Sequence, residues 1–166
     1  MKILFQLYLL AVLLPSVSIG EEHERHSFGK SYSGIEGLSP ELRNLLSEEM
    51  RQLQQGMTEI LPLYVSGRWA EIETIASKME NSYVLKQNLS EKQVHELHSK
   101  LPGGFIELDQ QFHYLSGMLA HAAKVEKSEL IGFYYSKMSD TCVSCHTQYA
   151  THKFPELAPT TKAHVH

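Results

Sequence analysis

Apolar residues recur at helical spacing along most of this chain. From Ser39 to about Gly67 they follow one another at steps of three or four, which places them on one face of a helix. These positions are Leu42, Leu46, Met50, Leu53, Met57, Ile60 and Tyr64. Ser39 followed by Pro40 and Glu41 is typical of a helix start. Because proline cannot donate a helical hydrogen bond, Pro62 is expected to kink the last turn or end the regular helix early.

Three later stripes predict three more long helices. Residues 69–83, 105–122 and 128–149 each repeat apolar side chains at helical steps. The apolar positions are Trp69, Ile72, Ala76, Met79 and Tyr83 in the first, Leu108, Phe112, Leu115, Leu119 and Ala122 in the second, and Ile131, Tyr135, Met138, Cys142, Cys145 and Tyr149 in the third. Ser90 and Gln93 form the pattern of a capping box, which predicts a short helix over residues 91–100, EKQVHELHSK. The sequence therefore predicts an all-α protein in which four amphipathic helices meet around one core.

The two ends of the chain lack this periodicity. Residues 1–20 are typical of a secretory signal peptide, with a basic residue near the start, an apolar run and small residues up to a cleavage site near Gly20. Residues 21–38 are polar and rich in Gly and Ser, and are expected to form a flexible arm. Residues 155–166 have no period and are expected to form a mobile tail. The helical domain is therefore assigned to residues 39–154.

Composition narrows the function classes. A chain of 166 residues with a formal net charge of −4 is large enough for one domain, and its mild acidity argues against nucleic acid as a partner. No stretch after the signal peptide is apolar enough to cross a bilayer, so we expect a soluble exported protein without stable membrane insertion. We find no nucleotide-binding glycine pattern and no positioned acid and base that would indicate an enzyme.

The segment TCVSCH, residues 141–146, contains both cysteines of the chain. Cys-x-x-Cys-His is the attachment signature of c-type haem, in which two thiols bond the vinyl groups and the adjacent imidazole binds the iron. On a helix, Cys142 and Cys145 lie almost on one edge, and His146 is turned by about 100° from Cys145. One short segment can therefore hold two positions of a porphyrin edge and the metal.

The two thiols have three other interpretations. A thioredoxin-type redox pair needs its first cysteine at a helix N-terminus after a strand, whereas Cys142 lies late in a predicted helix. A zinc site needs a second pair of ligands, for which His95 and His98 are the only tolerable candidates. A disulfide between Cys142 and Cys145 would be strained in a helix. Covalent haem attachment is the favoured interpretation, and a zinc site and a thioredoxin-type cysteine pair are the alternatives.

From about Leu38 to Phe154 the chain resembles the class II c-type cytochromes, which include cytochrome c prime and its low-spin relatives. That family combines a signal peptide, an antiparallel four-helix bundle and a single CxxCH on the last helix. Tyr149 matches the aromatic residue common after the motif, whereas Ala150 stands where the family usually has Arg or Lys. The resemblance implies one covalent haem c, a periplasmic location and redox partner proteins. Family members often form homodimers through their first two helices, so a homodimer is a further expectation.

The resemblance also implies that a methionine of the first helix fills the sixth iron position, or that this position is open. The string MRQLQQGM, from Met50 to Met57, is similar to the first helix of the low-spin members. Met50 is the first choice for the ligand, followed by Met57 and then Met118. The alternative is that Met50 only fills a gap in the core.

His113 is the other residue that bears on ligation. It follows Asp109 by one helical turn, so the two side chains share a helix face and can form a pair. We favour a pair that orients its neighbours over a sixth ligand or a donor to a haem propionate.

Two functions follow from the two coordination states. With His146 and Met50 both bound, the iron keeps six ligands in both oxidation states, which suits an electron carrier. If Met50 only packs, an apolar pocket beside the iron would admit small neutral ligands such as nitric oxide or carbon monoxide. The electron carrier is the preferred prediction.

Overall fold

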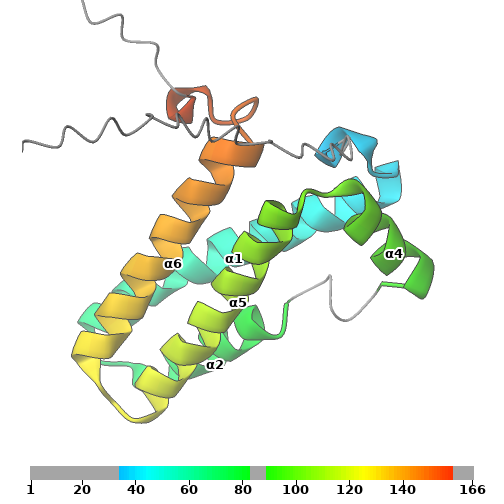
Figure 1. Ribbon diagram of the computed structural model, residues 1–166. Helices are drawn as coiled ribbons and strands as arrows, with labels where there is room; N and C mark the ends of the chain where they lie inside the picture. The colour runs from blue at the N-terminus through cyan, green and yellow to red at the C-terminus, as the bar shows by residue number, and fades with distance from the viewer. Residues whose placement is uncertain (1–33, 83–88, 159–166) are drawn as a thin grey trace, which may run out of the picture. The chain divides into compact units, whose positions relative to one another are not determined.

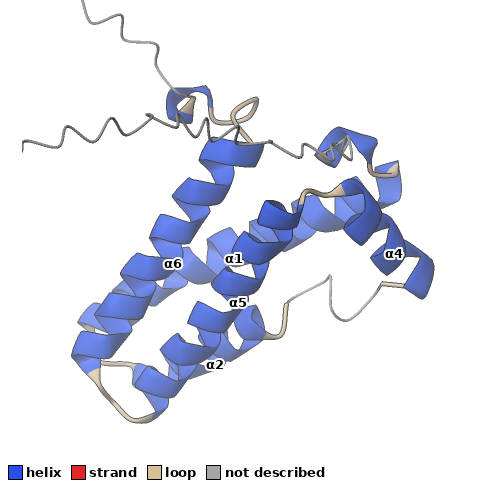
Figure 2. Cartoon of the chain, viewed as in Figure 1, coloured by secondary structure: helices blue, strands red, loops and turns tan. Residues whose placement is uncertain are grey.

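The computed structural model describes residues 34–82 and 89–158, and all regular structure in these two ranges is helical (Figures 1 and 2). The helices there are η1 (Ile35–Gly37), α1 (Pro40–Val65), α2 (Trp69–Glu80), α4 (Glu91–Lys100), α5 (Gly103–Lys124), α6 (Ser128–Tyr149) and η2 (Pro155–Leu157). The prediction of an all-α protein is confirmed for this part of the chain. None of its helices is long and apolar enough to span a membrane. The predicted signal peptide, most of the predicted arm and Tyr83 lie outside the described residues.

The helix ends follow local sequence signals. The Ser39 hydroxyl accepts a hydrogen bond from the Leu42 amide at the start of α1. Pro62 does not end α1, which continues through Val65. Ser66 caps the helix, and the next residue, Gly67, has a φ of +70°, a backbone conformation that favours glycine. The predicted capping box of Ser90 and Gln93 is present at the start of α4.

Buried apolar side chains form two clusters, which we name the main core and the end cluster. The main core joins α1, α2, α5 and α6 and contains Leu53, Ile60, Ile72, Ala76, Met79, Phe112, Leu119, Ala120, Ala122, Ala123, Ile131 and Met138. The end cluster contains Leu38, Leu42, Leu46, Leu101 and Phe105. These residues lie near the start of α1 and the start of α5, and α4 directly precedes α5 in the chain (Figure 1).

Helices α5 and α6 pack antiparallel. Near one end, the rings of Phe105 and Tyr149 meet edge to face with centroids 5.5 Å apart. Farther along, the Ser116 hydroxyl lies 4.0 Å from the Met138 sulfur. These two contacts fix the register of the helices, and they place the middle of the CxxCH segment opposite the α5 turn around Asp109.

The buried face of α1 differs from the predicted stripe at Met50. The buried positions are Leu42, Leu46, Glu49, Leu53, Gly56 and Ile60, which alternate steps of four and three. This spacing turns Glu49 inward, and Met50 lies on the flank of the helix with 37% of its surface exposed. Met50 therefore belongs to neither cluster, and its interpretation as a core filler is wrong.

The end of the predicted domain also differs from expectation. Phe154 donates a backbone hydrogen bond to the Ala150 carbonyl at 3.0 Å, and Leu157 donates one to Phe154 at 3.0 Å. The chain thus forms a turn after α6 and then η2, so residues 155–158 have defined structure. The rest of the predicted tail, residues 159–166, lies outside the described residues.

Candidate functional site

The CxxCH segment occupies the last turns of α6. Cys142 and Cys145 are both free thiols of intermediate exposure. Cys142 packs against the main core, whereas Cys145 packs against the end cluster. The two sulfur-bearing side chains therefore lie where the two apolar clusters meet.

The surroundings of the two thiols keep them neutral. Burial raises the pKa of Cys142 above its ordinary value. Burial, followed by the Coulombic effects of Asp109 and Cys142, raises the pKa of Cys145 to about 11. A redox or nucleophilic cysteine pair needs the opposite shift, since the thiolate is the reactive form. The position of Cys142 near the C-terminal end of α6, away from the positive end of the helix dipole, also disfavours a thioredoxin-type pair.

A zinc site finds no support in the described residues. Within residues 34–82 and 89–158, no group of three His, Cys, Asp or Glu side chains is placed to hold a metal ion. His95 and His98, the candidate second pair of ligands, lie on α4. Zinc in a structural site usually takes four protein ligands, and no fourth ligand joins Cys142, Cys145 and His146 in the described part of the chain.

Asp109 and His113 form the predicted pair on α5. The Asp109 carboxylate is 3.5 Å from Nε2 of His113. On the other side of the ring, Nδ1 of His113 donates to the Met79 carbonyl of α2 at 2.5 Å. Both imidazole nitrogens are therefore engaged by protein groups. His113 is buried between α5 and α2, and this geometry favours an orienting role over iron ligation.

Asp109 links this pair to the CxxCH segment. It lies on the α5 turn that faces α6, and its charge is one of the causes of the raised pKa of Cys145. Because His113 also contacts the Met79 carbonyl, residues of two helices, α5 and α2, take part in this arrangement. Sequence spacing alone could pair Asp109 with His113, but it could not show that Cys145 lies beside them.

His146 is held differently from His113. Its imidazole stacks on the Phe154 ring, with centroids 4.3 Å apart and an angle of 13° between the planes. Burial, and then the positive charge of Lys153, lower the pKa of His146. A neutral imidazole is the form that binds a metal, so both causes favour ligation near neutral pH. Sequence reasoning missed Phe154, because the turn that brings it back to His146 follows a helix end.

The candidate sixth ligands lie at different heights along the helices. Met50 falls between Leu46, which belongs to the end cluster, and Leu53, which belongs to the main core. It is therefore level with the CxxCH segment, whose cysteines contact the same two clusters. The exposed flank position leaves its thioether outside both clusters.

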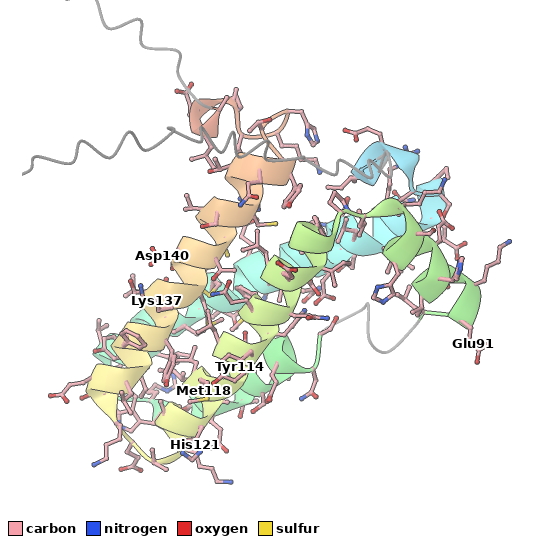
Figure 3. The ribbon with its side chains drawn as sticks, in the orientation of Figure 1. Glu91, Tyr114, Met118, His121, Lys137 and Asp140 are labelled. Atoms are coloured by element: carbon pink, nitrogen blue, oxygen red, sulfur yellow. The ribbon has the colours of Figure 1, made fainter. Side chains whose placement is uncertain are left out.

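Met57 and Met118 lie farther from the motif. The Met57 carbonyl accepts a hydrogen bond from the Tyr135 hydroxyl at 3.3 Å, and Tyr135 is about 15 Å along α6 from Cys145 at the usual helical rise. Figure 3 shows Met118 on α5 near His121, towards the C-terminal end of that helix. Among the three methionines considered, only Met50 is level with the CxxCH segment.

Comparison of the chain with protein-family models, with curated proteins and with solved structures finds no match to any of them. Two free thiols one turn apart and a neutral imidazole beside them are the donor set for one covalent haem c. Cys142 and Cys145 would hold its edge and His146 its iron, and the residues present fit the group.

Proposed function

We propose that this protein is a mono-haem c-type cytochrome built on an antiparallel four-helix bundle of α1, α2, α5 and α6. One observation carries the proposal: Cys142, Cys145 and His146 share the end of one helix, with both thiols neutral and placed where two apolar clusters meet. A porphyrin is a large apolar ring, so attachment there would bury it against side chains of both clusters. Haem bound at this position would supply one-electron redox chemistry.

Electron transfer is the function that this site supports best. His146 would bind the iron, and its ring is stacked on that of Phe154. Met50 is the proposed second axial ligand, because its thioether is level with the motif and is not packed in either cluster. Two fixed axial ligands limit the structural change that accompanies electron gain or loss, which suits a carrier. The protein is proposed to exchange electrons with redox partner proteins and to catalyse no reaction of its own.

The cell location and assembly are proposed by resemblance to the class II c-type cytochromes. Export through a cleaved signal peptide would place the protein in the periplasm, where haem is attached to such chains. A homodimer through α1 and α2 belongs to the same set of proposals.

A second candidate function follows from the exposed position of Met50. Because no core packing holds this side chain, Met50 would be a weakly retained ligand if it bound the iron. The protein would then bind nitric oxide or carbon monoxide at an open site. Carbon monoxide added to the reduced protein distinguishes the two candidates: a fast and complete spectral change indicates an open site, and a slow or partial one indicates Met50 ligation.

The proposal is tested by producing the full chain together with haem-attachment machinery and measuring its intact mass. We expect the mass of one covalent haem, with loss of attachment in a Cys142→Ser, Cys145→Ser double variant. Ser144→Ala, which changes a residue between the cysteines, serves as the matched control and should retain the haem. A chain that stays unmodified, or that carries a disulfide instead, would contradict the proposal.

A further inference from the structure

The ring nitrogens of His146 differ from those of His113. Within residues 34–82 and 89–158, no hydrogen bond reaches either ring nitrogen of His146. A metal-binding histidine ordinarily donates its other ring N–H to a carboxylate, a carbonyl or a water, which fixes the plane of the ring. His113, which is not the proposed ligand, has both ring nitrogens engaged. The contact that the structure shows for the His146 ring is an aromatic stack.

Phe154 provides such a contact. The nearly parallel rings, 4.3 Å apart, leave the imidazole little freedom to rotate about its side-chain bonds. This geometry also covers one face of the imidazole with an apolar ring. The half-buried His146 is thus shielded from solvent on the side of the turn that follows α6.

The backbone holds Phe154 in this place. Its amide donates to the Ala150 carbonyl at 3.0 Å, and the Ala150 amide in turn donates to the His146 carbonyl at 3.0 Å. The carbonyl of Phe154 accepts from Leu157 at 3.0 Å within η2. Phe154 is 41% exposed, so burial of its own ring does not account for this arrangement.

We propose that Phe154 is a positioning residue that sets the plane of the His146 imidazole by ring stacking. The inference rests on the proposed role of His146 as an iron ligand. Phe154 would not contact the iron and would act only through His146. Loss of the aromatic ring should therefore leave haem attachment intact while changing the electronic properties of the iron.

The first experiment examines the stack without haem. The full chain is prepared without attached haem, and the ring protons of His146 are observed by NMR, with His146→Gln to assign them. A stacked aromatic ring shifts these signals upfield, and we expect Phe154→Leu to abolish that shift. Phe133→Leu is the matched control, because Phe133 is an exposed aromatic residue of α6 that lies far from His146 along the helix. An unchanged His146 signal in Phe154→Leu would overturn the inference.

The second experiment examines the haem-attached full chain. We expect Phe154→Leu to broaden the ferric electron paramagnetic resonance signals, because the imidazole samples several planes, and to lower the reduction potential, because water approaches the ligand. Phe154→Tyr, which keeps the ring, should restore both properties, and Phe133→Leu should change neither. Identical spectra and potentials for Phe154→Leu and the native chain would overturn the inference, as would equal changes in Phe133→Leu.

The two proposals fail in different ways. If the intact mass shows no haem, both the proposed function and this inference fail. If haem is attached and the Phe154 variants behave like the native chain, the inference alone fails.

Discussion

At the scale of single residues, Cys145 shows how the site favours a neutral sulfur. Burial of this thiol and the nearby Asp109 of α5 both raise its pKa. A thioether is also neutral, so conversion of the thiol adds no charge to this apolar junction. The Asp109 side chain is partly exposed to solvent and lies 3.5 Å from Nε2 of His113.

The raised pKa of Cys145 predicts a loss of stability at high pH in the haem-free chain. Because the folded value of about 11 lies above the ordinary value of 9.0, the neutral thiol favours folding. This contribution is fully present below pH 9 and is lost as the pH rises through 11. Urea unfolding at a series of pH values should therefore show a steeper loss of stability for the native chain than for Cys145→Ser.

Two comparisons make this pH test specific. Ser144→Ala, a neighbour that does not titrate, should follow the native curve. The haem-attached protein should lack the Cys145 contribution, because its sulfur no longer carries a proton. Parallel curves for the native chain and Cys145→Ser would contradict the assigned environment of the thiol.

At the scale of helices, the contact between α5 and α6 depends on a residue without a side chain. A Cβ atom built on Gly104 would lie 2.7 Å from the Tyr149 hydroxyl oxygen, which is closer than real side chains approach. The Tyr149 ring is held edge to face against Phe105, so the hydroxyl cannot move aside without shifting the ring. Gly104 therefore lets the start of α5 approach the end of α6 beside the CxxCH segment.

Substitution of this glycine should weaken the fold. We expect Gly104→Ala to lower the free energy of unfolding by about 1–3 kcal/mol, the usual cost of overfilling a packed contact. Gly103→Ala is the matched control, because a Cβ atom there meets nothing within 4 Å and alanine favours helix. Urea unfolding of the two variants provides the measurement, and equal stabilities would show that Tyr149 yields without cost.

The helices could be predicted from sequence, but the exact direction of their faces could not. Periodicity located α1, α2, α5 and α6 because apolar residues at steps of three and four require a buried face. The predicted apolar stripe of α1 includes Met50, whereas in the structure the neighbouring Glu49 is buried. Both residues fit a helical step, and only packing against other helices decides between them.

The site shows the same division. The CxxCH motif is local, so Cys142, Cys145 and His146 could be found from spacing alone, and so could the pairing of Asp109 with His113. The position of Asp109 beside Cys145 depends on the register of α5 against α6, which no single segment contains. Phe154 reaches His146 through a turn after the helix end, where sequence periodicity carries no information.

At the scale of the molecule, the two apolar clusters differ in size. The main core contains buried residues from four long helices, whereas the end cluster has a few residues near the starts of α1 and α5. Fewer buried contacts allow local opening at lower free energy. Cys142 contacts the larger cluster and Cys145 the smaller one, so attachment at both cysteines would connect the two regions.

Hydrogen exchange of the backbone amides should reveal this difference. In the haem-free chain, we expect amides near Leu46 and Phe105 to exchange at least about tenfold faster than those near Ile72 and Leu119, since a difference of about 1.4 kcal/mol in opening free energy suffices. Haem attachment at Cys142 and Cys145 should narrow that gap, because opening of the end cluster would then expose the porphyrin as well. The Cys142→Ser, Cys145→Ser variant, carried through the same preparation, should keep the gap of the haem-free chain. Equal protection of both regions before attachment would show that the end cluster is as stable as the main core, and the junction at the two cysteines would then have no role in joining them.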